Sequence, residues 1–139
     1  MILSGCMTGR SALQGFNVLV VEDDADTQET VRRILEGEGA SVVTAGSAPE
    51  GLQAFLNAVP DVLVCDLGLP GADGYALIRQ IRELPLVLGG KTGAVALTAY
   101  SSEMHTKVMH AGFQAYLTKP VEPSQLVSTV AGLAFKSRQ

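Results

Sequence analysis

Carboxylates, a hydroxyl and an ammonium group stand at the ends of four apolar runs in this sequence. The first run is followed by Glu22 and Asp23, the third by Asp66, the fourth by Thr98 and the fifth by Lys119. Carboxylates that lie close together raise one another's pKa unless a cation compensates. Oxygens from two loops suit a hard divalent cation, and Mg²⁺ commonly binds one or two carboxylates together with phosphate oxygens. If folding brings these groups together, they can form a cation site beside a phosphate group.

One of these carboxylates can also react. An aspartate can act as a nucleophile and take a phosphoryl group as an aspartyl phosphate. Such a transfer needs little beyond alignment and neutralised charge. The divalent cation and Lys119 would supply the positive charge, and Thr98 would donate a hydrogen bond to the phosphoryl oxygens. The residue types therefore indicate phosphoryl transfer to a carboxylate, with Asp66 as the candidate acceptor.

The apolar pattern indicates which elements must position these groups. Five short runs rich in Val, Leu or Ala lack polar alternation, which is typical of strands buried on both faces of a parallel sheet. They are NVLVV (17–21), SVVTA (41–45), DVLVC (61–65), GAVAL (93–97) and AYL (115–117). Five segments have helical periodicity, with apolar positions that include Val31 and Leu35, Leu52 and Phe55, Leu77 and Ile81, Met104 and Val108, and Leu126 and Val130. We expect Asp26 to be the N-cap of the first helix.

Five strands that alternate with five helices predict a doubly wound α/β sheet. Right-handed crossovers place the carboxyl ends of all the strands at one edge of that sheet. Ligands bind at this edge in such folds, near the point where the strand order reverses. The predicted fold therefore delivers the carboxylates, the hydroxyl and the lysine to one place.

Composition narrows the class of protein. The 139 residues are 47% hydrophobic and 17% charged, which indicates one globular domain. The net charge is −4 and the basic residues are scattered, which argues against direct nucleic-acid binding. No apolar run reaches the ~20 residues of a membrane span. Two cysteines, one near the N-terminus and one in a predicted strand, give no disulfide framework and fit a cytoplasmic, reducing compartment.

Two short motifs resemble functional signals but lack their context. LSGC (3–6) resembles a bacterial lipoprotein cleavage box, yet only two residues precede it, where an apolar stretch is required. We interpret it as coincidence or as the remnant of a longer chain. GGKTG (89–93) resembles the end of a phosphate-binding P-loop, but Pro85 stands where that motif requires glycine and a strand is predicted where it requires a helix.

The residues at the strand ends resemble the receiver domain of two-component response regulators. The matching pieces are LVVEDD, CDLGLPGADG, ALTAY and YLTKP, which occur in this order at the expected strand ends. The resemblance covers about residues 17–134 and implies the flavodoxin-like receiver fold, with five parallel strands in the order 2-1-3-4-5 and five helices. We expect a receiver domain at 16–135, between a tail or linker at 1–15 and a C-terminal tail at 136–139.

The resemblance also implies a metal site and a phosphoacceptor. Asp66 would be the phosphoacceptor, and Lys119 would pair with the phosphoryl group. Asp23, together with Glu22 and Asp66, would hold Mg²⁺ or Mn²⁺, and the backbone carbonyl of Gly68 would complete the protein's ligands. Glu22 departs from the family pattern, in which Asp is commoner, so its metal contact is expected to be longer and to run through water.

Two further residues would transmit the effect of phosphorylation to the protein surface. The resemblance implies that Thr98 binds the phosphoryl group and shifts on activation, and that Tyr116 is an aromatic switch residue moving between exposed and inward positions. The surface that changes would be formed by the fourth helix, the fifth strand and the fifth helix. A homodimer through this surface is a further expectation.

The expected partner is a histidine kinase or a histidine phosphotransfer domain, whose phosphohistidine would supply the phosphoryl group. The chain itself would be a phosphoacceptor with slow self-dephosphorylation and not an enzyme. SALQGFNVLVVEDD (11–24) and the loop LPLVLGGKTG (84–93) resemble receivers at the C-terminus of hybrid sensor histidine kinases. We therefore expect the cytosolic part of a membrane-bound hybrid kinase, with a stand-alone response regulator as the near alternative.

Two other classes of function remain. A phosphoester hydrolase of the haloacid dehalogenase type would need a second Asp where Gly68 stands. A receiver-like interaction module that is never phosphorylated would not need the complete set of acceptor, metal ligands and lysine. Both are weaker interpretations than the phosphoacceptor.

Overall fold

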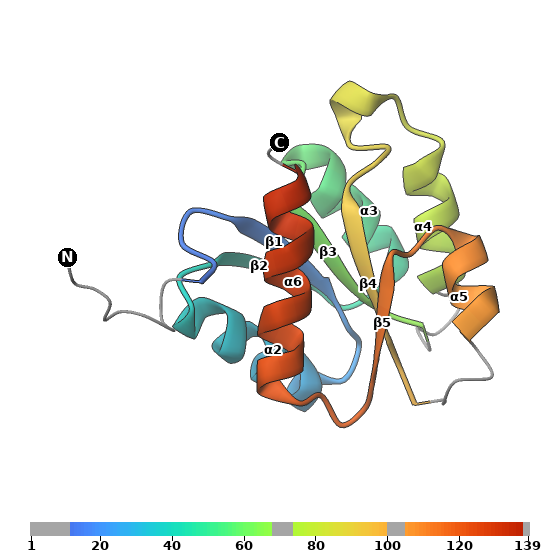
Figure 1. Ribbon diagram of the computed structural model, residues 1–139. Helices are drawn as coiled ribbons and strands as arrows, with labels where there is room; N and C mark the ends of the chain where they lie inside the picture. The colour runs from blue at the N-terminus through green and yellow to red at the C-terminus, as the bar shows by residue number, and fades with distance from the viewer. Residues whose placement is uncertain (1–11, 68–73, 100–104, 138–139) are drawn as a thin grey trace.

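A five-stranded parallel sheet lies between two layers of helices (Figure 1) in this computed structural model, which describes residues 12–67, 74–99 and 105–137. The strands are β1 (Asn17–Val21), β2 (Ser41–Ala45), β3 (Val62–Asp66), β4 (Gly93–Thr98) and β5 (Ala115–Thr118). The helices are α2 (Ala25–Gly37), α3 (Ala48–Asn57), α4 (Gly74–Arg82), the short 3₁₀ helix η2 (Leu86–Leu88), α5 (His105–Ala111) and α6 (Pro123–Ser137). The strand order is β2-β1-β3-β4-β5, which confirms the predicted doubly wound fold and its order 2-1-3-4-5.

Alternate residues of the central strands face two separate apolar clusters. Leu19 of β1 and Leu63 of β3 face the cluster that α3, α4 and α5 complete. Val20 and Val64 face the cluster that α2 and α6 complete. Burying each such side chain contributes about 1.5–3 kcal/mol to the free energy of folding. This alternation therefore specifies the register of the strands.

The two edge strands are less buried than the sequence predicted. We expected all five strands to be buried on both faces, but in β2 exposed and half-buried positions alternate, and Val43 is 54% exposed. None of the residues of β5 is fully buried. Both strands end the sheet, so helices cover them incompletely and each has one neighbouring strand instead of two.

The N-cap of the first helix lies two residues earlier than predicted. The N-cap of α2 is Asp24, in extended conformation, and not Asp26. The Asp24 Oδ2 atom accepts hydrogen bonds from the Thr27 N–H at 2.9 Å and from the Thr27 hydroxyl at 2.6 Å. These bonds satisfy an N–H group that the helix itself cannot pair. Asp24 thus stabilises the start of the helix.

The packed part of the chain includes Leu13, which lies N-terminal to the expected span 16–135. Leu13 is fully buried among the residues of α2 and α6, and its N–H donates to the Glu38 carbonyl at 2.9 Å. Over the ranges that the structure describes, no helix combines the length and the apolar character needed to cross a membrane.

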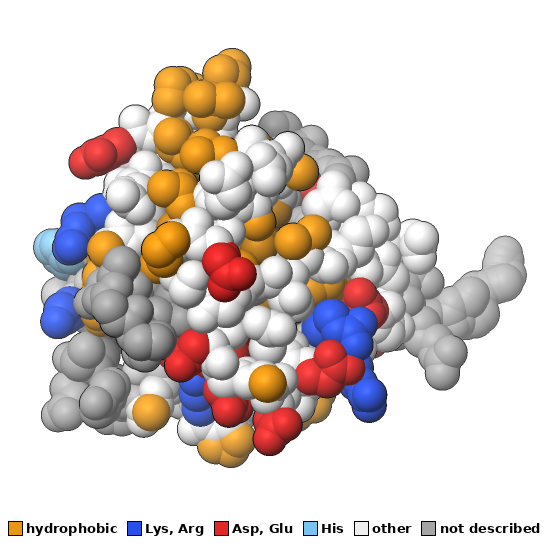
Figure 2. All heavy atoms as spheres, turned by 180° about the vertical axis from the view of Figure 1, so that it is seen from behind, with side chains coloured by type: hydrophobic (Ala, Val, Ile, Leu, Met, Phe, Trp, Pro, Cys, Tyr) orange, Lys and Arg blue, Asp and Glu red, His pale blue; other side chains and the backbone are white. Residues whose placement is uncertain are grey.

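Hydrophobic and acidic side chains gather at opposite ends of the molecule (Figure 2). The upper end in that view carries η2, whose residues Leu86, Val87 and Leu88 are 68%, 87% and 44% exposed. Acidic side chains are frequent at the lower end, where the strands of Figure 1 have their carboxyl ends. The predicted functional edge is therefore the acidic one.

Candidate phosphoryl-transfer site

The register of the sheet brings the predicted site residues to one edge. Val21 of β1 pairs with Cys65 of β3, so Glu22 and Asp66 follow side by side. Thr98 of β4 pairs with Thr118 of β5, directly before Lys119. Four residues that lie up to 97 positions apart in the sequence (22 to 119) thus meet because the strands are parallel and in this order.

Three carboxylates form a cluster at this edge. One oxygen from each of Glu22, Asp23 and Asp66 lies within 4.8 Å of the others. Glu22 is fully buried and Asp66 is 5% exposed, whereas Asp23 is exposed. Such a set of oxygens suits a hard divalent cation that keeps some of its waters, because the exposed side of the cluster remains open.

Lys119 supplies the positive charge inside the protein. Its Nζ lies 2.9 Å from Glu22 Oε1 and 3.3 Å from Asp66 Oδ1. Burial alone would lower the pKa of Lys119, but its hydrogen bonds and attraction to Glu22 and Asp66 raise that pKa above its usual value. The backbone N–H of Lys119 donates to the Thr98 carbonyl at 2.8 Å, and the Lys119–Pro120 peptide bond is cis. The ammonium is therefore charged and held against both carboxylates.

Two opposing effects act on the pKa of the buried Glu22 carboxylate. Burial raises its pKa to about 6, against the hydrogen bonds from Lys119 and from the Asp24 N–H, which lower it. The Asp24 N–H reaches Glu22 Oε2 at 3.1 Å. Each oxygen of this side chain thus has a protein partner, a lysine on one side and a backbone N–H on the other.

Gln28 was missed by the sequence analysis. Its side-chain amide donates to the Glu22 carbonyl at 2.9 Å and to the Ala45 carbonyl at 3.2 Å. It therefore joins the ends of β1 and β2 just below the acidic cluster. Glutamine is an ordinary helix-forming residue, so nothing in the residue type alone distinguished it.

The last glycine of CDLGLPGADG has a packing role that the sequence did not reveal. A Cβ on Gly74 would lie 2.5 Å from the Asp66 carbonyl oxygen and 3.1 Å from Cys65 Sγ. Helix α4 begins at Gly74, so its first turn rests directly on the backbone of the candidate acceptor. A side chain at this position would push the helix away from Asp66.

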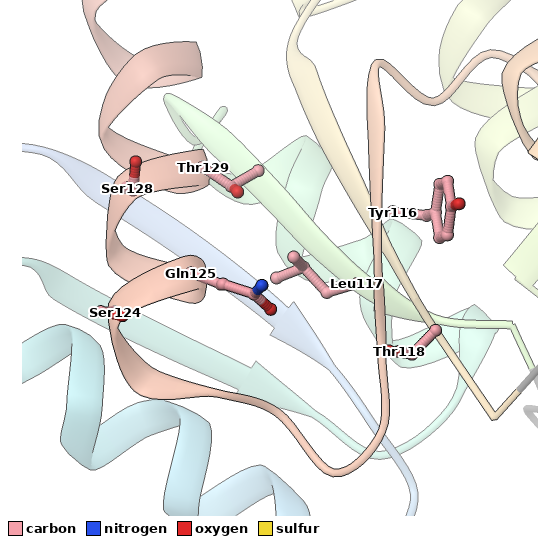
Figure 3. A pocket seen from close by; sticks show the side chains of 7 residues that line it. All are labelled: Tyr116, Leu117, Thr118, Ser124, Gln125, Ser128 and Thr129. Carbon is pink, nitrogen blue, oxygen red and sulfur yellow. The ribbon is translucent and has the colours of Figure 1, made fainter. Parts of the chain in front are cut away.

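Thr98 is the last residue of β4, and Tyr116 lies within β5. Thr98 is 2% exposed at the end of β4. Tyr116 is half-buried and packs against the cluster of α3, α4 and α5. Figure 3 shows its ring on the opposite side of β5 from Leu117, which points toward α6. The predicted metal ligand Gly68 lies outside the described residues, as do Tyr100, the last residue of ALTAY, and Met104 of the fourth predicted helix.

Comparison with known proteins decides the family. Residues 18–131 match the family described as the response regulator receiver domain. The chain belongs to this family. Receivers are the domains of two-component signalling that interact with histidine kinases or phosphotransfer domains.

Similar proteins include both small and large chains. An uncharacterised 14.6 kDa protein of Leptolyngbya boryana, from the 3′ region of sodA1, is 43% identical over 119 residues, which are 85% of this receiver and 89% of that protein. "Probable histidine kinase 2" of Oryza sativa subsp. indica is 33% identical over 136 residues, which are 87% of this receiver but 13% of that protein. The crystal structure of a CheY-like receiver domain protein from Methanospirillum hungatei has a TM-score of 0.79 at 28% identity, and the match covers 91% of this receiver and 97% of that chain.

Proposed function

We propose that this receiver accepts a phosphoryl group on Asp66 from the phosphohistidine of a histidine kinase or phosphotransfer domain. The observation that carries the proposal is the contact of Lys119 Nζ with Asp66 Oδ1 at 3.3 Å, inside a cluster of three carboxylates. A lysine beside an acceptor carboxylate neutralises the charge that the incoming phosphoryl oxygens bring.

The donor set fits Mg²⁺ or Mn²⁺. Glu22, Asp23 and Asp66 offer only oxygen ligands, within 4.8 Å of one another, and hard divalent cations prefer such ligands. The ion, when bound, supplies charge neutralisation and orientation for the phosphoryl oxygens. Asp23 and Asp66 are the direct protein ligands in this proposal, together with the Gly68 carbonyl. Glu22, held by Lys119 and the Asp24 N–H, acts through water.

The transfer itself exchanges one bond for another. An oxygen of the Asp66 carboxylate forms a new P–O bond while the P–N bond of the donor phosphohistidine breaks. The imidazole leaves with the electron pair of that bond and takes up a proton. Later attack of water on the aspartyl phosphate returns Asp66 and inorganic phosphate. Lys119 pairs with the phosphoryl oxygens throughout, because its ammonium already lies against Asp66.

The phosphoryl group would then shift the population of two conformations of one surface. In this proposal Thr98, at the end of β4, donates a hydrogen bond to the phosphoryl oxygens. Tyr116 lies on the neighbouring strand β5, opposite Ala96 of β4. The surface that responds is formed by α5, β5 and α6, the fourth helix, fifth strand and fifth helix of the prediction. A homodimer could form through the same surface.

The protein context of this receiver is a separate proposal. We propose that it belongs to a hybrid histidine kinase, because a similar segment forms 13% of a protein named as a histidine kinase. The alternative is a stand-alone response regulator, which is favoured by a relative of nearly the same length, 89% of which is covered.

Intact-mass measurement tests the function. The protein is incubated with Mg²⁺ and acetyl phosphate, a small phosphodonor. We expect one added phosphoryl group on the wild type, and none on Asp66→Asn or in the presence of EDTA. An unmodified wild type would contradict the proposal. Rapid consumption of acetyl phosphate without an accumulating adduct would instead favour a phosphoester hydrolase.

A further inference from the structure

A second concave site lies at the other edge of the sheet. The end of α4, the turn before β4 and the last turn of α6 surround a pocket of about 510 Å³. In Figure 1, α6 ends and β4 begins at the upper end of the molecule, whereas β1 and β3, which lead to the acidic cluster, end toward the lower end. Small-ligand sites usually have volumes of ~300–1,000 Å³. The pocket has this size and shares no described residue with the proposed phosphoryl-transfer site.

The wall of this pocket is cationic. Arg82, Lys91 and Lys136 line it, and no Asp or Glu of the described residues does. Among those residues, none of the three cations forms an ion pair with a carboxylate. The whole chain has a net charge of −4, so the pocket wall has the opposite sign of charge to the protein as a whole. A concave wall with uncompensated positive charge attracts anions.

Arg82 is fixed in place and keeps a spare donor. Its Nε and Nη2 donate to the Gly112 carbonyl at 2.9 and 2.7 Å, its Nη1 to the Gly90 carbonyl at 3.0 Å, and its Nη2 to Gln114 Oε1 at 3.1 Å. Within the described ranges, one N–H of Nη1 has no partner and remains for a ligand. Because the guanidinium is half-buried without a carboxylate partner, burial lowers its pKa, and an anion in the pocket would compensate its charge.

Gln114 is oriented in the same way. Its Oε1 accepts hydrogen bonds from the Ala94 N–H at 2.8 Å and from Arg82. No described residue accepts a hydrogen bond from its amide nitrogen, which is therefore a donor at the pocket wall. Leu133 adds an apolar surface beside these groups. The lining therefore combines fixed hydrogen-bond donors, the ammonium groups of two exposed lysines and one apolar contact.

The negative ends of two helix dipoles offset only part of the positive charge of the pocket wall. Arg82 and Lys136 lie in the last turns of α4 and α6, where a cation stabilises a helix. Each helix end carries about half a negative charge, so the two ends together oppose roughly one of the three positive charges. Lys91 lies in the turn before β4 and in neither helix. The net charge of the wall remains positive.

We propose that this pocket binds a small anion with a diphosphate group. The ammonium groups of Lys91 and Lys136, the remaining Nη1 N–H of Arg82 and the amide of Gln114 hold the phosphate oxygens through charge-assisted hydrogen bonds. Leu133 packs against the organic part when the ligand is a nucleoside diphosphate. Binding here is independent of phosphoryl transfer to Asp66.

Titration of the ¹⁵N-labelled protein tests the site. ADP and pyrophosphate are added separately in EDTA, which keeps the acidic edge free of metal, at about 0.15 M salt, which screens diffuse attraction. We expect saturable shifts of the Gly93 and Gln114 amides with at least one of the two probes. A stronger response to ADP identifies a nucleotide, and equal responses identify the diphosphate group alone as the ligand.

A charge-matched pair of double variants separates the pocket from general attraction. Lys91→Gln with Lys136→Gln should weaken binding by at least about tenfold, because two charge-assisted hydrogen bonds are lost. Lys107→Gln with Arg33→Gln changes the net charge equally at exposed positions outside the pocket and should leave the affinity unchanged. Equal weakening in both variants, or no saturable shift with either probe, would overturn the proposal.

Discussion

Lys119 and Glu22 form a 2.9 Å ion pair that joins the ends of β5 and β1, two strands that are not neighbours in the sheet. The ammonium reaches across the end of β3, where it also contacts Asp66. Glu22 is fully buried, and a buried carboxylate needs a compensating charge. The pair therefore fixes Lys119 in the position from which it can meet a phosphoryl group.

Replacing Lys119 should impair phosphorylation. We expect Lys119→Met to slow the reaction of Asp66 with acetyl phosphate by about 10²-fold, as for the loss of one positioned donor to a developing negative charge. The rate is measured by intact mass against time, and Lys136→Met, at the other edge of the sheet, is the matched control. A Lys119→Met protein that reacts as fast as the wild type would refute this role.

Gln28 should position the acidic edge. Gln28→Ala leaves the Glu22 and Ala45 carbonyls without their side-chain donor, which should lower the free energy of unfolding by about 1 kcal/mol and weaken Mg²⁺ binding. Urea unfolding and a Mg²⁺ titration measure the two effects. Gln53→Ala removes an amide that donates to the exposed Asn57 side chain and should change neither. A variant at position 28 with unchanged Mg²⁺ affinity would limit Gln28 to a structural role.

Gly74 should not accept a side chain. Gly74→Ala places a Cβ 2.5 Å from the Asp66 carbonyl oxygen, and we expect a loss of about 1–3 kcal/mol in the free energy of unfolding, together with slower phosphorylation. Gly132→Ala is the control, because a Cβ at this helical position meets nothing within 4 Å and should stabilise α6 by about 0.5–1 kcal/mol. Equal stability of the two variants in urea would contradict the packing argument.

The charge network on α2 should make stability depend on pH. Hydrogen bonds from Arg32, and then from Arg33, lower the pKa of Glu29 from 4.5 to about 2. Because the folded-state pKa is below the ordinary one, the contribution of Glu29 to stability is complete above pH 4.5 and disappears as the pH falls toward 2. Glu29→Gln should therefore be less stable than the wild type at about pH 7, with a gap that narrows below about pH 4.5 and at high salt.

Urea unfolding of both proteins across this pH range measures that gap. The side chain of Glu29 is 43% exposed, so the effect is small and is best seen at low salt. A gap that stays constant from neutral to acid pH would show that Glu29 does not contribute through its charge.

The sequence predicted the fold, and the sheet edge at which the candidate site residues meet, through features that depend on chain order. Asp66, Thr98 and Lys119 were found because each follows an apolar run, and a parallel sheet must deliver such residues to one edge. Whether a residue follows a strand can be read from its neighbours in the sequence. The sequence alone therefore indicated the positions of these three residues.

What the sequence did not reveal depends on contacts between distant segments. Asp24 and Asp26 are both good capping residues, and only the backbone conformation at the helix start distinguishes them. The exposure of Val43 follows from the place of β2 at the sheet edge, which its own apolar pattern does not express. Gly74 and Gln28 act on the backbones of Asp66 and Ala45, partners that only the folded chain brings to them.

Localising the phosphoryl group tests the central claim most directly. After incubation with acetyl phosphate and Mg²⁺, borohydride reduces an aspartyl phosphate to homoserine, which peptide sequencing by mass spectrometry detects at one position. We predict homoserine at position 66 with Mg²⁺ and none with EDTA. Homoserine at Asp23 or at another carboxylate, or unmodified Asp66 in the presence of Mg²⁺, would contradict the account.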